Sequence, residues 1–118
     1  MILVDTSIWV DHLRKGSTTL RSLLDEGGVA IHPFIIGELA CGSMRKRDEI
    51  LELLNELPQV GVADQREVLH LVEAEQLHGQ GIGWIDAHLL ASARLSGALI
   101  WTADKRLRSA AAALGLAR

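Results

Sequence analysis

Four short apolar runs, most of them rich in β-branched residues, are spaced along the chain. They are residues 2–4, 29–31, 60–62 and 98–100. Each run is too short to be a buried helix, and each is apolar at consecutive positions rather than at alternate ones. This pattern is typical of central strands in a parallel sheet that is covered on both faces. We therefore expect four such strands.

Between these runs the apolar positions recur with the period of a helix. One helix is expected to begin near Ser7, and Pro33 suits the first turn of another. Asp64 and Glu67 have the spacing of a capping box, and Gly97 suits the end of a helix. The predicted order is β-α-α-β-α-α-β-α-α-β-α. Parallel strands joined by helical crossovers predict an α/β fold, a three-layer α/β/α sandwich with a mainly parallel sheet, in one domain over residues 1–118.

The composition excludes several classes of protein. Apolar residues make up 48% of the chain and the formal net charge is −3, which argues against a disordered or a generally basic protein but allows a local basic patch. The single cysteine, Cys41, excludes an internal disulfide and favours a reducing, cytoplasmic location; we expect it to be a small buried residue. Asp5 interrupts any N-terminal signal core, and no apolar run approaches the ~20 residues of a membrane span.

Four acidic residues are placed where ligands bind in such a fold, at the carboxyl ends of the strands. Asp5 and Asp104 follow the first and last runs, Glu38 lies in the helix after the second run, and Asp86 begins the helix before the last run. Each could be a helix cap or a solvated side chain. Glu38 and Asp86, however, are embedded in apolar stretches, whereas surface carboxylates usually have polar neighbours. We therefore expect all four to face one crevice.

Clustered carboxylates require a positive charge. At ~5 Å and an effective dielectric constant of 20, one pair of like charges costs roughly 3 kcal/mol. Several such pairs would force protonation unless a cation were bound. Oxygen ligands without paired histidines or cysteines select a hard cation, Mg²⁺ or Mn²⁺, which in an α/β crevice most often serves phosphate chemistry.

Four motifs, in order and covering the whole chain, resemble those of PIN-domain ribonucleases, specifically the VapC-type toxins of toxin–antitoxin modules. The motifs are ILVDTSIWVD at 2–11, GELACG at 37–42, IDAHLLASA at 85–93 and LIWTAD at 99–104. The resemblance implies a metal-dependent endoribonuclease that forms a homodimer. It also implies a cognate VapB-type antitoxin whose tail fills the active-site groove, in a heterotetramer or larger assembly. Family members often end in one more short strand, which here would be rudimentary or absent.

The resemblance also assigns roles to residues. Asp5, Glu38, Asp86 and Asp104 match the acidic quartet that binds one or two Mg²⁺ or Mn²⁺ ions and carries the catalysis. Asp5 and Asp86 would be the surest direct ligands, whereas Glu38 and Asp104 would bind directly or through water, or help to deprotonate the attacking water. The small hydroxyl residues that orient these carboxylates would be Thr102, Thr6 and Ser7.

Two basic segments follow the acidic motifs, and we expect them to border the crevice and bind the RNA phosphates. The alternative is that they are solvated helix starts. The residues are Arg45, Lys46, Arg47, Lys105 and Arg106.

Aromatic residues on which bases could stack are scarce, with only Trp9, Phe34, Trp84 and Trp101 available. The glycine-rich segment 79–83 is expected to be a connector, the alternatives being a hinge or a loop beside the site. His88, two residues from Asp86, is expected to point to another helix face and to be structural or at the surface.

The chain also carries more apolar helix than one thin domain is expected to bury, which favours a C2 homodimer. The residues concerned are Leu51, Leu53, Leu54, Leu57, Ile35 and Ile36.

Other readings explain less. A haloacid-dehalogenase-like phosphohydrolase needs a second aspartate two residues after Asp5, where this chain has Ser7. A phosphoacceptor domain needs acidic residues before Asp5, and there are none. A non-catalytic PIN-like interaction module remains an alternative, although the intact quartet argues against it.

Overall fold

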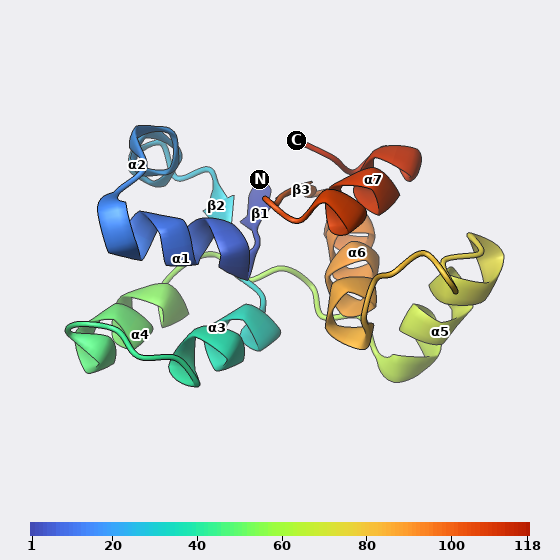
Figure 1. Ribbon diagram of the computed structural model, residues 1–118, viewed down its shortest axis with the longest axis horizontal. Coiled ribbons are helices and arrows are strands. Elements are labelled where there is room, and N and C mark those ends of the chain that lie inside the picture. Colours follow the sequence, from blue (N-terminus) through green and yellow to red (C-terminus); the bar gives the residue numbers. More distant parts are fainter.

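The computed structural model describes residues 1–118 as three strands and seven helices (Figure 1). In chain order they are β1 (Ile2–Val4), α1 (Thr6–Lys15), α2 (Thr18–Asp25), β2 (Val29–Ala30), α3 (Pro33–Ala40), α4 (Arg47–Asn55), α5 (Gln65–Ala74), α6 (Trp84–Ser96), β3 (Leu99–Trp101) and α7 (Lys105–Ala113). All seven predicted helices are present. The capping box at the start of α5 is also present, with Glu67 N donating to Asp64 Oδ1 at 2.8 Å and Asp64 N donating to Glu67 Oε1 at 3.0 Å.

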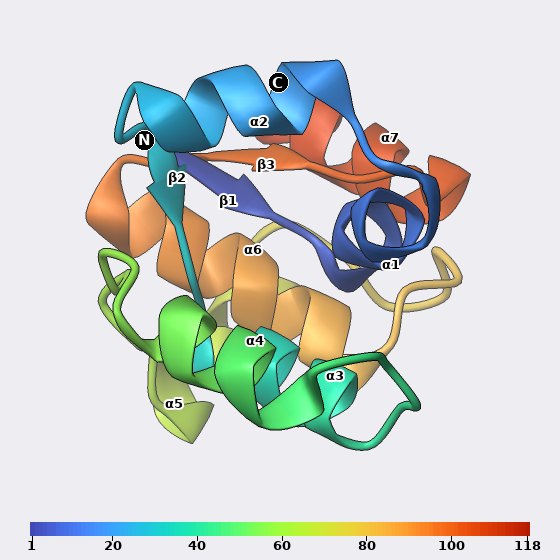
Figure 2. The same ribbon diagram turned by 90° about the vertical axis from the view of Figure 1, so that its left-hand side faces the viewer.

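The three strands form a parallel sheet in the order β2-β1-β3. Single parallel bridges extend it at both edges, where Gln59 pairs with Ile31 and Ala117 pairs with Ile100. The predicted rudimentary final strand is thus one bridge, held by Ile100 N to Leu116 O at 2.7 Å and Arg118 N to Ile100 O at 3.0 Å. Helices α2 and α7 cover one face of the sheet, and α3, α4 and α6 lie on the other (Figure 2). The predicted three-layer α/β/α class is confirmed.

The predicted strand at 60–62 is wrong. Val60 is buried, but Val62 is 49% exposed and the segment adds only the Gln59 bridge to the sheet. The next backbone donors are taken by serine side chains of α6: Gly61 N donates to Ser96 Oγ at 2.7 Å, and Ala63 N to Ser92 Oγ at 3.0 Å. Because helix hydroxyls satisfy these donors, the segment does not need a neighbouring strand.

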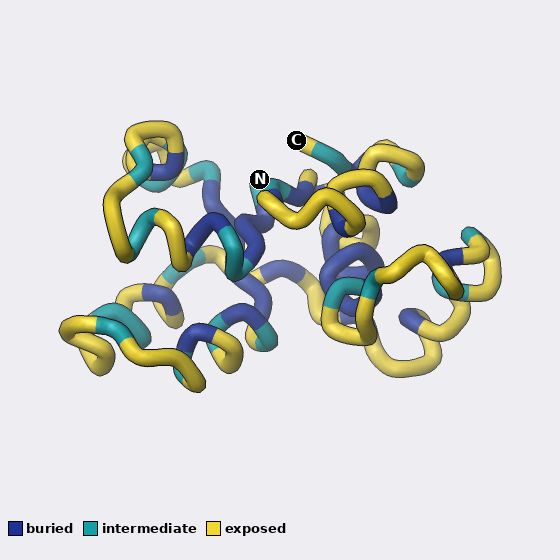
Figure 3. The backbone as a smooth tube through the Cα atoms, viewed as in Figure 1, coloured by how far each residue is buried: buried dark blue, intermediate teal, exposed yellow.

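The core lies between the sheet and α6. Leu3, Val4 and Ile100 in the strands are buried, and every residue of α6 from Ala87 to Ala93 is also buried. The buried sections of the tube in Figure 3 accordingly run through the strands and the middle of α6. A helix that is buried on all sides is fixed by packing from every direction. The core therefore gives Asp86, in the first turn of α6, a rigid base.

None of the helices combines the length and the apolar composition that crossing a membrane would require.

Candidate active site

The carboxyl ends of β1 and β3 bring Asp5 and Thr102 together. The strands are neighbours in parallel register, and Asp5 N donates to Trp101 O at 2.9 Å just beyond the last paired residues. Thr102 Oγ1 then donates to Asp5 Oδ2 at 2.7 Å, in a buried contact between residues 97 positions apart. Parallel pairing of two strands thus creates the centre of the site.

Ser7 gives the same carboxylate a second hydrogen bond. Ser7 Oγ donates to Asp5 Oδ2 at 2.9 Å and accepts from Ala103 N at 3.0 Å. Asp5 is 8% exposed and occupies the N-cap position of α1, yet its side chain makes no capping bond to the helix. The capping alternative for Asp5 is therefore not what the geometry supports. Both hydroxyls bond to Oδ2, and Oδ1 accepts none of the hydrogen bonds in the structure.

Asp104 is held by the backbone at the start of α7. Its Oδ1 accepts from Arg106 N at 2.9 Å and from Leu107 N at 3.2 Å, so this carboxylate does cap a helix. Asp104 N in turn donates to Thr102 Oγ1 at 3.0 Å. Arg108 Nη2 donates to the Thr102 carbonyl at 3.0 Å. Thr102 is therefore fixed from both its backbone and its side chain.

Glu38 and Asp86 stand on helices and have fewer partners. Thr6 Oγ1 donates to Glu38 Oε1 at 2.7 Å, which ties α1 to α3. Asp86 is the third residue of α6, and its Oδ2 accepts from Gly83 N at 3.3 Å. All three hydroxyl residues that the sequence singled out thus hydrogen-bond to a carboxylate of the quartet.

The pKa of the Asp86 carboxyl responds both to burial and to the other three acids. Burial raises the pKa of the Asp86 carboxyl, and the charges of Asp5, Asp104 and Glu38 raise it further, while the hydrogen bond from Gly83 N opposes the shift. The other three predicted site acids thus act on Asp86 through their charges. In this arrangement, however, no three carboxylate, imidazole or thiol groups are close enough to enclose a metal ion.

A hollow of about 530 Å³ adjoins Glu38 between α1, α3 and the segment that leads into α4. Thr6 and Glu38 line it together with Arg14, Arg45 and Lys46. Two of the predicted basic residues therefore border the acidic site. Arg14 was missed by the sequence reasoning, although it lies two helical turns after Thr6 on α1 and this spacing could have identified it.

The other predicted basic residues have different surroundings. Arg47 donates from Nη2 at 2.8 Å and from Nε at 3.2 Å to the carbonyl of Ala40, so it stabilises the C-terminal end of α3. Its predicted contact with RNA stays a prediction. Lys105 and Arg106 are exposed in the first turn of α7. The Arg106 side chain lies over Gly81, which has a φ of +78°.

Two predictions about reactive side chains have definite outcomes. Cys41 is exposed at the end of α3, so the expectation that it is buried is wrong. His88 is only 6% exposed, and its Nδ1 has no hydrogen-bond partner. Its ring packs between Phe34 and Trp84, with both centroid distances at 4.7 Å. The prediction that His88 is structural is consistent with this packing.

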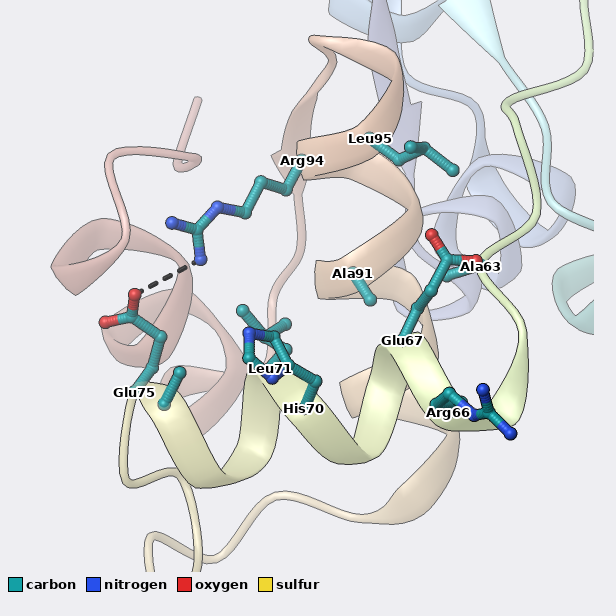
Figure 4. Close-up of a pocket in the computed structure, with 10 residues that line it drawn as sticks. Ala63, Arg66, Glu67, His70, Leu71, Glu75, Ala91, Arg94 and Leu95 are labelled. Atoms are coloured by element: carbon teal, nitrogen blue, oxygen red, sulfur yellow. Dashed lines mark hydrogen bonds and ion pairs between the residues drawn. The ribbon is translucent and has the colours of Figure 1, made fainter.

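A second hollow, of about 520 Å³, lies between α5 and α6 (Figure 4). An ion pair between Arg94 and Glu75, with Nη1 and Oε1 3.2 Å apart, crosses one end of it. Its lining contains His70 but none of the four predicted acids. This hollow is therefore separate from the site at the strand ends.

Comparison with known proteins agrees with the geometry. Residues 2–113 match the PIN domain family. The chain is also 48% identical over 118 residues to "Ribonuclease VapC32" of Mycobacterium tuberculosis, in strain CDC 1551 / Oshkosh and equally in strain ATCC 25618 / H37Rv. In both cases the match covers 99% of this chain and 95% of the relative. The chain belongs to the PIN-domain family and, within it, to the VapC-type toxins.

Proposed function

We propose that this protein is a divalent-metal-dependent endoribonuclease that acts as the toxin of a toxin–antitoxin module. The observation that carries the proposal is the arrangement at the strand ends, where Thr102 and Ser7 both donate to Asp5, Thr102 accepts from Asp104 N, and Thr6 donates to Glu38. The charges of the other three acids raise the pKa of Asp86 after burial has done so, as is expected of carboxylates grouped for a cation. Further support comes from the ribonuclease name of relatives that are 48% identical over nearly the whole chain.

The donor chemistry fits Mg²⁺ or Mn²⁺, one ion or two. Every candidate ligand is a carboxylate oxygen, and Asp5 Oδ1 has no competing hydrogen bond. We propose Asp5 and Asp86 as direct ligands, and Glu38 and Asp104 as ligands bound directly or through water. A bound divalent ion supplies activation of water and neutralisation of the phosphate charge.

The residues of the chain then position the reacting groups. Thr102 and Ser7 hold Asp5 Oδ2 so that Oδ1 keeps one direction. Glu38 is exposed and holds one hydrogen bond, from Thr6, which leaves Oε2 free to accept the proton of the attacking water. The water oxygen bonds to phosphorus as the bond from phosphorus to the leaving ribose oxygen breaks.

The RNA backbone needs positive charge beside this acidic centre. The hollow at Glu38 supplies it through Arg14, Arg45 and Lys46, and Lys105 and Arg106 supply it beside Asp104. We propose that a single RNA strand runs between these two groups of cations across the four carboxylates. The overall charge of −3 then restricts RNA binding to this path.

Assembly with partners is part of the proposal. We propose a cognate VapB-type antitoxin that occupies the groove and a homodimer of the toxin. The dimer is expected because of apolar helix surface that one domain would leave exposed. Part of that surface is buried within the chain, because Ile35 is fully buried and Leu54 is 3% exposed. Leu53 is 53% exposed and remains available for contact. Sedimentation at high micromolar concentration tests the dimer, and a monomer there would refute it.

The purified protein should cleave single-stranded RNA in the presence of Mg²⁺ or Mn²⁺ and should stop when a chelator removes the ion. An inducible copy should also arrest bacterial growth. A matched variant, Asp11→Asn, changes an exposed carboxylate of α1 outside the site and should retain both properties. Cleavage that persists at the same rate with the ion removed would refute the metal-nuclease proposal. Absence of cleavage under all these conditions would favour the non-catalytic interaction module.

A further inference from the structure

An aromatic cluster lies at the start of α6, next to the acidic site. The rings of Trp84 and His88 are 4.7 Å apart at an interplanar angle of 86°, and those of His88 and Phe34 are 4.7 Å apart at 55°. Phe34 in turn contacts His32, with centroids 4.9 Å apart. Contacts of this kind fix ring orientation, so the outermost ring, that of Trp84, is held from behind.

Among the four aromatic residues of the chain, Trp84 is the one that remains open to a ligand. Trp9 is 4% exposed and belongs to the core. Trp101 is covered by Arg118, whose guanidinium carbon lies 4.6 Å from the ring centroid. Phe34 is half-buried, whereas Trp84 is 45% exposed. Exposing a large apolar ring to water to this extent is unfavourable, which indicates that a ligand covers it.

The location of Trp84 connects it with the proposed reaction. It is two residues before Asp86 on α6. Phe34, in the same cluster, lies one turn before Glu38 on α3 and therefore on the same helix face. The cluster thus adjoins Glu38 through Phe34, whereas Trp84 shares the first turn of α6 with Asp86 but projects from a different face of that helix. The buried Nδ1 of His88, behind Trp84, has no partner within the protein.

Arg106 packs against Gly81 in the loop that leads into Trp84. The Arg106 side chain packs so closely over Gly81 that a Cβ there would lie 2.6 Å from Arg106 Cδ. Gly81 also has a φ of +78°, so its lack of a side chain serves both the turn and the close approach. Arg106 makes no ion pair in the structure and its guanidinium is available to an anion. The glycine-rich loop therefore fixes the position of the Arg106 side chain.

We propose that Trp84 stacks on an unpaired base of the RNA next to the scissile phosphate, while Arg106 binds a neighbouring phosphate. The inference rests on the proposed ribonuclease function and names the two side chains that would hold the RNA strand beside the acids. Stacking on tryptophan is available to any base, whereas the bases of a duplex are already stacked on one another. The protein therefore selects single strands through Trp84 rather than through the acids.

Binding of a single-stranded oligoribonucleotide to the Asp5→Asn protein, which should not cleave it, tests the platform. Trp84→Ala should weaken binding about tenfold, as expected for the loss of one stacked base, and Trp84→Phe should restore most of it. Leu95→Ala, an exposed apolar side chain of the same helix, is the matched control and should bind like the parent. An oligonucleotide of the same length without bases should bind the parent and Trp84→Ala equally. Equal binding of the base-containing RNA by the parent and Trp84→Ala would overturn the proposal.

The charge contribution is measured separately. Arg106→Ala should reduce the salt dependence of binding, whereas Trp84→Ala should leave that dependence unchanged. If Trp84→Ala binds RNA like the parent while the parent still cleaves RNA with the metal, this inference alone is rejected. A Trp84 effect on binding without any cleavage by the parent protein would reject the proposed ribonuclease function and retain the platform.

Discussion

The four acids of the site form two pairs that are held in different ways. Asp5 and Asp104, the strand-end pair, follow β1 and β3, and together they accept four hydrogen bonds from hydroxyls and backbone N–H groups. Glu38 and Asp86, the helix-borne pair, stand on α3 and α6 and accept one hydrogen bond each. The strand-end pair is therefore oriented by two hydrogen bonds on each carboxylate, whereas the position of the helix-borne pair depends mainly on how α3 and α6 pack.

This difference explains how all four carboxylate ligands can be present although they are not yet close enough to enclose an ion. The carboxylates influence the pKa of Asp86, yet no three acidic, imidazole or thiol groups enclose an ion. The strand-end pair has little freedom to move, so closure around an ion falls to Glu38 and Asp86. Each has to give up only one hydrogen bond, which costs about 1 kcal/mol. We therefore expect substitutions of these acids, and of the residues that hydrogen-bond to them, to have effects of different size on cleavage and stability.

The largest effects should come from removing a direct ligand in either pair. Asp5→Asn and Asp86→Asn keep the shape of the side chain but weaken a hard-ion site, because an amide oxygen is a poorer ligand than a carboxylate. RNA cleavage should fall a hundredfold or more, since ~1.4 kcal/mol of lost transition-state stabilisation is already tenfold in rate. Asp11→Asn should cleave like the parent. If both ligand variants cleave RNA at the parental rate, neither pair is catalytic.

A stability effect should appear where the two helices of the helix-borne pair are joined. His32 Nδ1 accepts from Phe34 N at 2.9 Å, and Nε2 lies 3.2 Å from Ser92 Oγ on α6. Burial lowers the pKa of this fully buried imidazole to about 4 and the His88 charge contributes. The unfolded chain binds the proton more tightly, at an ordinary pKa of about 6.5. Stability should thus fall as pH drops from about 6.5 to about 4, by about 3 kcal/mol in all.

Chemical denaturation at pH 7 and at pH 4.5 measures this effect. His32→Asn keeps a side-chain acceptor for the Phe34 N–H but cannot take up the proton. The variant should be less stable than the parent at neutral pH and should lose less stability on acidification. The exposed His78→Asn is the matched control and should keep the parental pH dependence. An identical pH dependence in the parent and His32→Asn would contradict the prediction.

The supports of the two pairs should differ in a smaller but diagnostic way. Thr102→Val removes a buried hydroxyl that bonds to Asp5 and accepts from Asp104 N. We expect at least about a tenfold loss of cleavage, because a hydrogen bond to a charged group contributes roughly 1.5–3 kcal/mol. Thr6→Val removes the single hydroxyl on exposed Glu38 and should cost about threefold or less. Steady-state kinetics of the two variants on one RNA measure both losses. A loss in Thr6→Val as large as that in Thr102→Val, or larger, would remove the distinction between the pairs.

The smallest effect should come from the cations beside the helix-borne pair. Arg45→Ala removes one positive charge from the hollow next to Glu38. The slope of log binding constant against log salt should become shallower by about 0.7, the value for one phosphate of a single strand. The cleavage rate at saturating RNA should barely change. An unchanged slope would show that this side of the site does not carry RNA.

The strands show how much of the fold the sequence predicted. Apolar runs predicted β1, β2 and β3 to within one residue, because a buried parallel strand has to be apolar on both faces. The run at 60–62 has the same composition, and only the tertiary contacts of Ser92 and Ser96 explain why it is not a strand. Composition alone cannot report which donors are already satisfied.

The candidate site was predictable for similar reasons. Residues that follow strands meet because parallel strands end at the same edge, which is why Asp5 and Asp104 could be placed together in advance. The role of Thr102 was implied by the family resemblance. The role of Arg108, by contrast, depends on a hydrogen bond to the Thr102 carbonyl, and the sequence showed it only as one more basic residue. The seating of Arg106 over Gly81 depends on loop geometry that no periodicity encodes.

Thermal unfolding in the presence of Mn²⁺ tests most directly whether the two pairs form one metal site. An ion that binds only the folded chain stabilises it by mass action, so millimolar Mn²⁺ should raise Tm by several degrees in the parent and in Asp11→Asn. Asp5→Asn from the strand-end pair and Asp86→Asn from the helix-borne pair should each lose most of that increase. A parental Tm that does not respond to Mn²⁺, or an increase that survives in both ligand variants, would contradict a metal site built from these four carboxylates.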